Sequence, residues 1–145
     1  MKLKPDERNT IMADKKKSFS VKIEKKSIDL FYMTPQRIEA KDIADLFRDN
    51  RELTVELWAE MNVVELVLSN QDSLDFEAID ADFTAPSDAA FVKNREIKTV
   101  YAINLYEEDL PVATPYFEKL VVKYSGFVCA DSEDFTPVYA GSSKR

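Results

Sequence analysis

Val100-Tyr-Ala-Ile-Asn-Leu105, an amphipathic run at residues 114–124 and Phe127-Val-Cys-Ala130 follow one another in the last third of the chain. The first and third are apolar segments of strand length, and the run between them has its apolar residues at helical spacing. The order strand, helix, strand predicts a packed β-α-β unit. We expect the strands that precede it to assemble against this unit.

A further strand is predicted upstream, at Ile28-Asp-Leu-Phe-Tyr-Met33. Thr34 is a favourable helix N-cap residue, and Pro35 is a favourable residue for the first helical turn. The sequence therefore predicts an amphipathic helix over about residues 35–48, with its apolar side chains on one face.

Apolar and polar residues alternate from Glu52 to about Asp80, and polar turns near residues 60–62 and 70–73 divide this stretch into three segments. Alternation with period two is typical of half-buried strands, so the stretch predicts a three-stranded antiparallel meander. The middle segment also fits helical spacing, but its β-branched residues favour a strand. The side chains expected to face the core are Leu53, Val55 and Leu57, then Val64, Leu66 and Leu68, then Leu74, Phe76 and Ala78.

Two smaller elements complete the pattern. The break at Ala85-Pro-Ser87 precedes a short helix that we expect at residues 88–92. Residues 135–139 are expected to form an edge strand, because Pro137 cannot donate a hydrogen bond within a sheet.

The predicted fold class is therefore α+β, with a single domain at residues 27–141. Its sheet is expected to be mixed or mostly antiparallel, made of the three-stranded meander and the C-terminal β-α-β unit, with two or three helices packed on one face. Residues 1–26 are interpreted as a basic arm that is disordered in part, and residues 142–145 as a mobile tail.

Composition favours a soluble, cytoplasmic protein. Of the 145 residues 45% are hydrophobic and 32% charged, and no apolar run approaches the about 20 residues that a membrane-spanning helix needs. The first eight residues carry charges where a signal peptide has its apolar segment. The single Cys129 excludes an internal disulfide and lies in an apolar segment, where a thiol usually acts as a small buried hydrophobe.

Two absences exclude much catalytic chemistry. The chain has no histidine, which excludes Ser-His-Asp and Cys-His arrangements and His-based zinc sites. It has only two glycines, Gly126 and Gly141, so neither a dinucleotide-binding turn nor a phosphate-binding loop can be formed. We therefore expect no enzymatic activity, no cofactor and no bound metal.

Charge is distributed unevenly along the chain. The net charge is −7, but residues 1–26 contain nine Lys and Arg residues against four acids, so this segment carries +5 and the remainder −12. Lys15-Lys-Lys17 is interpreted as part of a solvated tail, and we do not expect direct nucleic-acid binding. From Glu52 to Val92 there is no Lys or Arg, and there are ten acids: Glu52, Glu56, Glu60, Glu65, Asp72, Asp75, Glu77, Asp80, Asp82 and Asp88.

The alternation of the meander predicts that several of these acids share the face that points away from the core. Like charges close together across strands destabilise a sheet, and the sequence places no Lys among them. A basic partner would offset that cost, and a Trp on the same face would anchor the contact. A solvated face without a partner is the alternative, and a register shift of one residue would exchange the two faces. The predicted partner-binding residues are Glu56, Trp58, Glu65, Asp75, Glu77, Asp80 and Asp82.

Three functional hypotheses follow. The first is a small non-enzymatic binding or inhibitor protein that occupies a basic surface of a partner such as a nuclease, a toxin or a nucleic-acid-handling complex, as immunity proteins and nucleic-acid mimics do. The second is a scaffolding subunit that associates through apolar surface at Val63, Val67 and residues 135–139. The third is a carboxylate-metal hydrolase that uses Asp80, Asp82 and Asp131-Ser-Glu-Asp134.

Overall fold

The structure, a computed structural model, describes residues 25–143, so most of the predicted arm and the end of the predicted tail lie outside the described residues. The strands are β1 (Ser27–Thr34), β2 (Thr54–Trp58), β3 (Val63–Val67), β4 (Ser73–Ile79), β5 (Thr99–Tyr106), β6 (Phe127–Ala130) and β7 (Val138–Gly141). The helices are α2 (Ala40–Phe47), α3 (Pro86–Asn94) and α4 (Leu110–Tyr124), with 3-10 turns at Ala59–Met61 and Glu107–Asp109.

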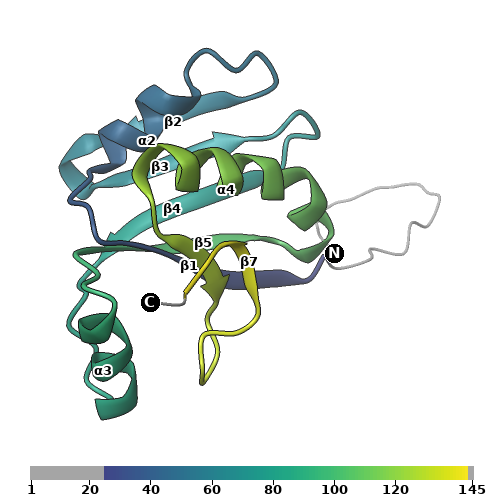
Figure 1. Cartoon of the computed structure of the whole chain (residues 1–145). Helices are drawn as coiled ribbons and strands as arrows, with labels where there is room; N and C mark the ends of the chain where they lie inside the picture. Colours follow the sequence, from purple (N-terminus) through teal and green to yellow (C-terminus); the bar gives the residue numbers. More distant parts are fainter. Residues whose placement is uncertain (1–24, 144–145) are drawn as a thin grey trace, which may run out of the picture.

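All seven strands belong to one sheet in the order β2-β3-β4-β5-β1-β6-β7 (Figure 1). Every pair of neighbouring strands is antiparallel, so the sheet is not mixed. The predicted single-domain α+β class is confirmed.

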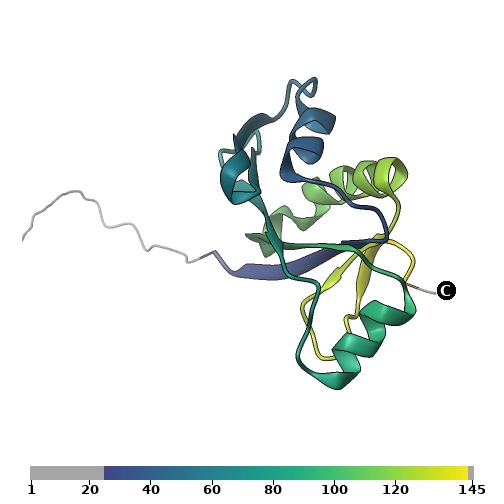
Figure 2. The same cartoon turned by 90° about the vertical axis from the view of Figure 1, so that its left-hand side faces the viewer.

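The helices lie on both faces of the sheet, whereas the sequence predicted them on one. Figure 2 shows α2 and α4 on one side and α3 on the other. The side that carries α2 and α4 encloses the larger core. On the opposite side Val92 of α3 and Phe135 pack against Phe31 of β1 in a second, smaller core. The second helix layer is needed because apolar side chains of β1, β5 and β6 also point to this side.

The β-α-β unit is present, but with another strand inserted into it. Helix α4 connects β5 to β6, and β1 lies between these two strands and pairs antiparallel with both. Leu30 and Tyr32 of β1 face the larger core, while Phe31 and Met33 face the smaller one. Burial on both faces explains why β1 is a continuous apolar run in sequence rather than an alternating one.

Several element boundaries differ from the prediction. Helix α2 begins at Ala40 rather than near residue 35, because Thr34 still belongs to β1 and a capping box between Glu39 and Asp42 starts the helix. Helix α4 begins at Leu110, four residues before the predicted run, directly after a 3-10 turn. The last strand begins at Val138 instead of residue 135.

Strands β2, β3 and β4 are consecutive antiparallel neighbours, and their apolar side chains face the larger core as the alternation predicted. The register that would exchange the two faces is not adopted. The buried members are Val64, Leu66, Leu68, Leu74 and Phe76, and the partly buried ones are Leu53, Val55, Leu57 and Ala78.

Asn62, in the turn between β2 and β3, connects four elements. Its backbone is left-handed (φ 57°), a conformation that Asn tolerates better than most residues. Its side-chain oxygen accepts hydrogen bonds from the N–H of Ala40 (2.6 Å), at the start of α2, and from the hydroxyl of Tyr101 (3.2 Å), in β5. Its carbonyl accepts a third from the N–H of Ala78 (3.1 Å), in β4. Both Ala40 and Tyr101 are fully buried.

We predict that Asn62→Ala lowers the free energy of unfolding by about 2–4 kcal/mol, since it leaves the buried N–H of Ala40 unpaired and replaces Asn with a residue that tolerates a left-handed backbone less well. Chemical denaturation monitored by circular dichroism measures the change. Gln71→Ala is the matched control, because Gln71 also has a positive φ (75°) and its side chain makes no described hydrogen bond. An equal loss in both variants would contradict the role assigned to the Asn62 side chain.

Candidate protein-interaction face

The sheet face opposite α2 and α4 carries the acidic residues of β2, β3 and β4. The strand registers place Glu56 opposite Glu65, and Glu65 opposite Asp75, so three carboxylates form a row across the sheet. The next row contains Trp58, Val63 and Glu77. Neighbouring strands lie about 4.8 Å apart, and successive rows on one face about 7 Å apart. We call the surface formed by Glu56, Trp58, Glu65, Asp75 and Glu77 the acidic face.

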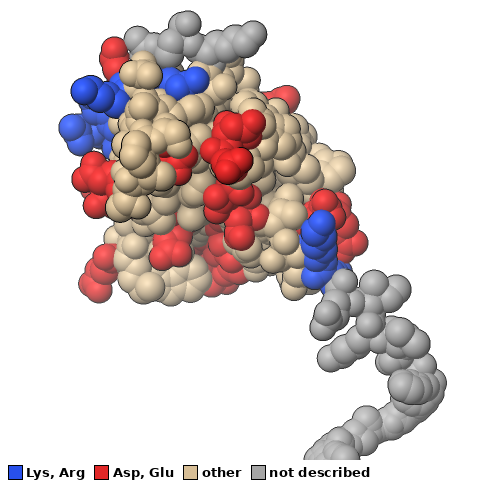
Figure 3. All heavy atoms as spheres, turned by 90° about the horizontal axis from the view of Figure 1, so that it is seen from below, with Lys and Arg blue, Asp and Glu red and all other residues tan. Residues whose placement is uncertain are grey.

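Within residues 25–143, no Lys or Arg forms an ion pair with a carboxylate of the acidic face. The ion pairs of this part of the chain lie elsewhere and join Lys25 to Asp72 and Glu108, Lys26 to Glu107, and Arg48 to Asp45. In Figure 3 acidic side chains occupy the middle of the view from below, and the Lys and Arg side chains lie toward its margins. The acidic face therefore concentrates negative charge without a described counter-charge.

Asp75 ends the row of carboxylates on β4, between Glu65 of β3 and Asn104 of β5. Burial raises the pKa of its carboxyl above the ordinary value, and the neighbouring Glu65 raises it further. Glu65 is itself bound, since the hydroxyl of Ser73 donates a hydrogen bond to it. Burial, with a further contribution from the Glu65 carboxylate, thus makes Asp75 hold its proton more tightly in the folded chain than in the unfolded one.

Apolar side chains border the acidic row. Trp58 is 43% exposed and Met61, in the adjoining 3-10 turn, is 69% exposed. Together with Val63, Glu65 and Asp75 they line a shallow hollow of about 320 Å³. Trp58 points away from α2, so that helix does not cover it. Local sequence patterns do not predict the exposure of Met61, because it depends on the shape of the 3-10 turn.

Five of the seven predicted site residues are brought together, and two are not. Glu56, Trp58, Glu65, Asp75 and Glu77 share one face of the sheet. Asp80 and Asp82 lie in the connection between β4 and α3, where the Asp80 carboxylate accepts a hydrogen bond from the N–H of Asp82 (3.1 Å). Strand β4 ends at Ile79, so the alternation that placed the other acids does not extend to these two.

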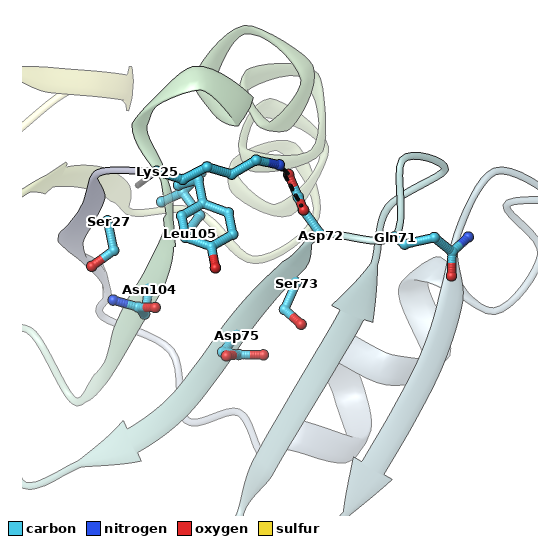
Figure 4. A pocket seen from close by; sticks show the side chains of 9 residues that line it. Lys25, Ser27, Gln71, Asp72, Ser73, Asp75, Asn104 and Leu105 are labelled. Carbon is cyan, nitrogen blue, oxygen red and sulfur yellow. Dashed lines mark hydrogen bonds and ion pairs between the residues drawn. The ribbon is translucent and has the colours of Figure 1, made fainter. Parts of the chain in front are cut away.

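A polar cleft of about 520 Å³ extends the acidic face toward the start of β1 (Figure 4). Its lining includes Ser73 and Asp75 of β4 and Asn104 of β5. Figure 4 shows Lys25 reaching to Asp72, and the Lys25 ammonium lies 2.9 Å from one carboxylate oxygen of Asp72. Lys25 thus lines the same cleft as Asp75, and its charge is already engaged by Asp72.

The turn that holds Asp72 also reaches Asp109, a carboxylate that the sequence analysis did not single out. Asp109 is 2% exposed, and Asn70 donates a hydrogen bond to its Oδ1 (2.9 Å). Burial raises the pKa of Asp109, and the nearby Asp72 adds to the rise. The contact depends on how the β3–β4 turn packs against the start of α4, which local sequence patterns do not predict.

The described residues do not favour a reactive thiol, a metal site or a membrane-spanning helix. Burial raises the pKa of the Cys129 thiol to about 12, so the thiol stays protonated and is a poor nucleophile. No group of three or more Cys, Asp or Glu residues among residues 25–143 is arranged to hold a metal ion. None of the helices in this range is long and apolar enough to cross a bilayer.

Comparison with known proteins adds no assignment: no protein-family model matches the chain, and no curated protein or solved structure matches it significantly. The acidic face is therefore the feature from which function has to be inferred.

We predict that Asp75→Asn stabilises the protein at neutral pH. A carboxyl whose pKa is raised by folding destabilises the native state above that folded pKa, and the effect disappears as the pH falls toward the ordinary value of 3.8. The difference in unfolding free energy between variant and wild type should therefore be positive at pH 7 and shrink on acidification. Denaturant titrations between pH 3.5 and pH 7 test this in the range given by the ordinary carboxyl pKa.

Asp134→Asn is the control of opposite sign. Hydrogen bonds from the hydroxyl and N–H of Thr136 lower the pKa of Asp134, so its carboxylate stabilises the fold above pH 3.8 and loses that effect as the pH falls through its lowered pKa. Asp134→Asn should be less stable than wild type at pH 7. A loss of stability in Asp75→Asn at pH 7 would contradict the repulsion described for the acidic face.

Proposed function

We propose that this chain is a small non-enzymatic binding protein whose acidic face occupies a basic surface of a partner protein. The observation that carries the proposal is the row of Glu56, Glu65 and Asp75, which has no described basic counterpart. Carboxylates directly opposite one another destabilise a free sheet. A basic partner removes that repulsion on binding, so the free energy lost in the unbound fold favours the complex.

Trp58 would give the interface an apolar anchor, which the carboxylates do not provide. Interface hot spots are enriched in Trp, and they are surrounded by groups that exclude water. Trp58 lies beside Met61 and Val63 at the border of the charged row, so one patch offers an apolar anchor and an electrostatic rim. The charges would accelerate and orient the encounter, and the anchor would slow dissociation.

The partner class that best fits is a protein with an Arg- and Lys-lined cleft, such as a nuclease, a toxin or a nucleic-acid-handling complex. Such clefts bind phosphates, and carboxylates spaced across a sheet present a comparable negative surface. The protein would then act as an inhibitor in the manner of immunity proteins or nucleic-acid mimics, an analogy at the level of class. We place it in the cytoplasm, where a single free thiol such as Cys129 is maintained.

Association through apolar surface, the scaffolding hypothesis, retains one supporting observation. Trp58 and Met61 are exposed, and Val63 is next to them. The other part of the surface originally considered is less suitable, because Phe135 is buried among the rings of Phe31, Phe83 and Phe91. A homodimer that persists in high salt, detected by light scattering, would favour this second function.

We predict that neutralising three acids of the face, by Glu56→Gln, Glu65→Gln and Glu77→Gln together, lowers the association rate roughly tenfold or more at low salt. It should also flatten the salt dependence of that rate. The partner is first captured from a host lysate at low salt, released at high salt and identified by mass spectrometry. Stopped-flow mixing with the purified partner then measures the rate.

The matched control is Asp49→Asn, Glu118→Gln and Glu133→Gln, which changes the net charge equally at exposed positions outside the face. Its association rate should remain close to that of the wild type. If both triple variants associate at the wild-type rate, the acidic face is not the binding surface.

We further predict that Trp58→Ala weakens the same complex by about 2 kcal/mol or more, mainly through faster dissociation. Met61→Ala tests the border of the patch and should have a smaller effect, because Met61 lies in the turn outside the strand rows. Surface plasmon resonance separates the two rates. A dissociation rate unchanged by Trp58→Ala would remove Trp58 from the interface.

A further inference from the structure

Strand β2 is the last strand on its side of the sheet, so its outer edge is unpaired within residues 25–143. Along an antiparallel strand, alternate residues direct their N–H and C=O groups to opposite sides. The outer edge of Thr54–Trp58 therefore presents hydrogen-bonding groups that an added strand can satisfy. The opposite edge of the sheet is less suitable, because β7 is four residues long and follows Pro137, which has no N–H.

Strand β2 ends the sheet, but the apolar side chains that it directs to the core are not fully covered. Val55 and Leu57 pack against the larger core, yet both stay partly exposed. On the other face Glu56 and Trp58 end the two rows of the acidic face at this same edge. A further strand would thus meet apolar side chains on one of its faces and an acidic row with an aromatic neighbour on the other.

We propose that the partner element is an extended basic segment that pairs with the outer edge of β2 and continues the sheet. This inference rests on the proposed function and names the structure that the partner presents to it. Side chains of the segment beside Glu56 are Lys or Arg, and they extend the row of Glu56, Glu65 and Asp75. The alternate side chains are apolar and cover Val55 and Leu57. Main-chain pairing supplies affinity, and the alternation supplies specificity.

Charge selects this occupant over a second copy of the chain. Two β2 edges paired with each other would bring the acids of both strands together, and like charges across a strand pair are unfavourable. No Lys or Arg occurs between Glu52 and Val92 to offset that repulsion. A basic strand meets the opposite situation, because its cation beside Glu56 lies next to an acid and continues the row of Glu56, Glu65 and Asp75. The edge is therefore closed to self-pairing and open to a basic segment.

The test uses a seven-residue peptide that alternates valine and lysine, with blocked ends, as the probe. It is titrated into the full chain and followed by Trp58 fluorescence and by nuclear magnetic resonance shifts of backbone amides. Binding should shift the amides of residues 53–58 most and slow hydrogen exchange at the outward N–H groups of β2. Glu56→Lys should weaken binding at least tenfold, and the control Glu118→Lys should leave it unchanged.

Two methylated peptides distinguish main-chain pairing from docking by charge alone. One carries N-methyl groups at the lysines and the other at the valines, so each loses the N–H donors of one edge only. Pairing with β2 predicts that one of the two binds at least tenfold more weakly than the other. Equal binding of both, or no binding of the parent peptide, would overturn the inference.

The proposed function would still stand if the triple Gln variant slowed capture of the natural partner. Slow exchange of β2 amides that increases with protein concentration would identify a second copy as the occupant and also overturn it.

Discussion

Strand β1 is buried on both faces, and this burial determines how the rest of the chain is arranged. Its side chains alternate between two cores, so the sheet needs cover on both sides at its centre. Helices α2 and α4 cover one side, and α3 with the segment around Phe135 covers the other. The second cover lies over β1, β5 and β6 and reaches β4 at Ile79. The rest of β4, with β2 and β3, has no such cover on this side within residues 25–143, and this is the region that carries the acidic face.

The uncovered region carries more charge of one sign than a soluble sheet face needs. A solvated sheet face is stabilised when opposite charges alternate, but here Glu56, Glu65 and Asp75 follow one another across three strands. Burial raises the pKa of Asp75, and the charge of Glu65 adds to that rise as part of this cost. The folded chain can bear this cost because the other face of the same strands is well packed, with Val64, Leu66 and Phe76 fully buried. Stability from one face of the meander thus permits repulsion on the other.

How much of this could be predicted from the sequence depends on whether a feature is local. The alternation from Glu52 to Ile79 has a period of two, so it placed Glu56 and Trp58 on the right face without knowledge of the rest of the fold. The position of β1 between β5 and β6 is a pairing between distant segments, and no local pattern contains it. The start of α2 depends on both kinds of feature: the capping box of Glu39 and Asp42 is local, whereas Asn62, which accepts a hydrogen bond from the N–H of Ala40, comes from another part of the chain. Asp80 and Asp82 lie in the connection after β4, where the alternation that ends at Ile79 predicts nothing about their positions.

The edge strand brings the constraints of folding and of binding together. Sheet edges are commonly protected from aggregation by charged side chains, often Lys. Strand β2 carries one charged residue, the acid Glu56, at the end of a face that is also acidic. Its protection therefore discriminates between other molecules by their charge. It repels another copy of itself and attracts a chain of opposite charge. The same carboxylates therefore oppose pairing with a second copy and favour binding of a basic chain. This difference is the physical reason for treating the free edge, the acidic row and Trp58 as one binding surface.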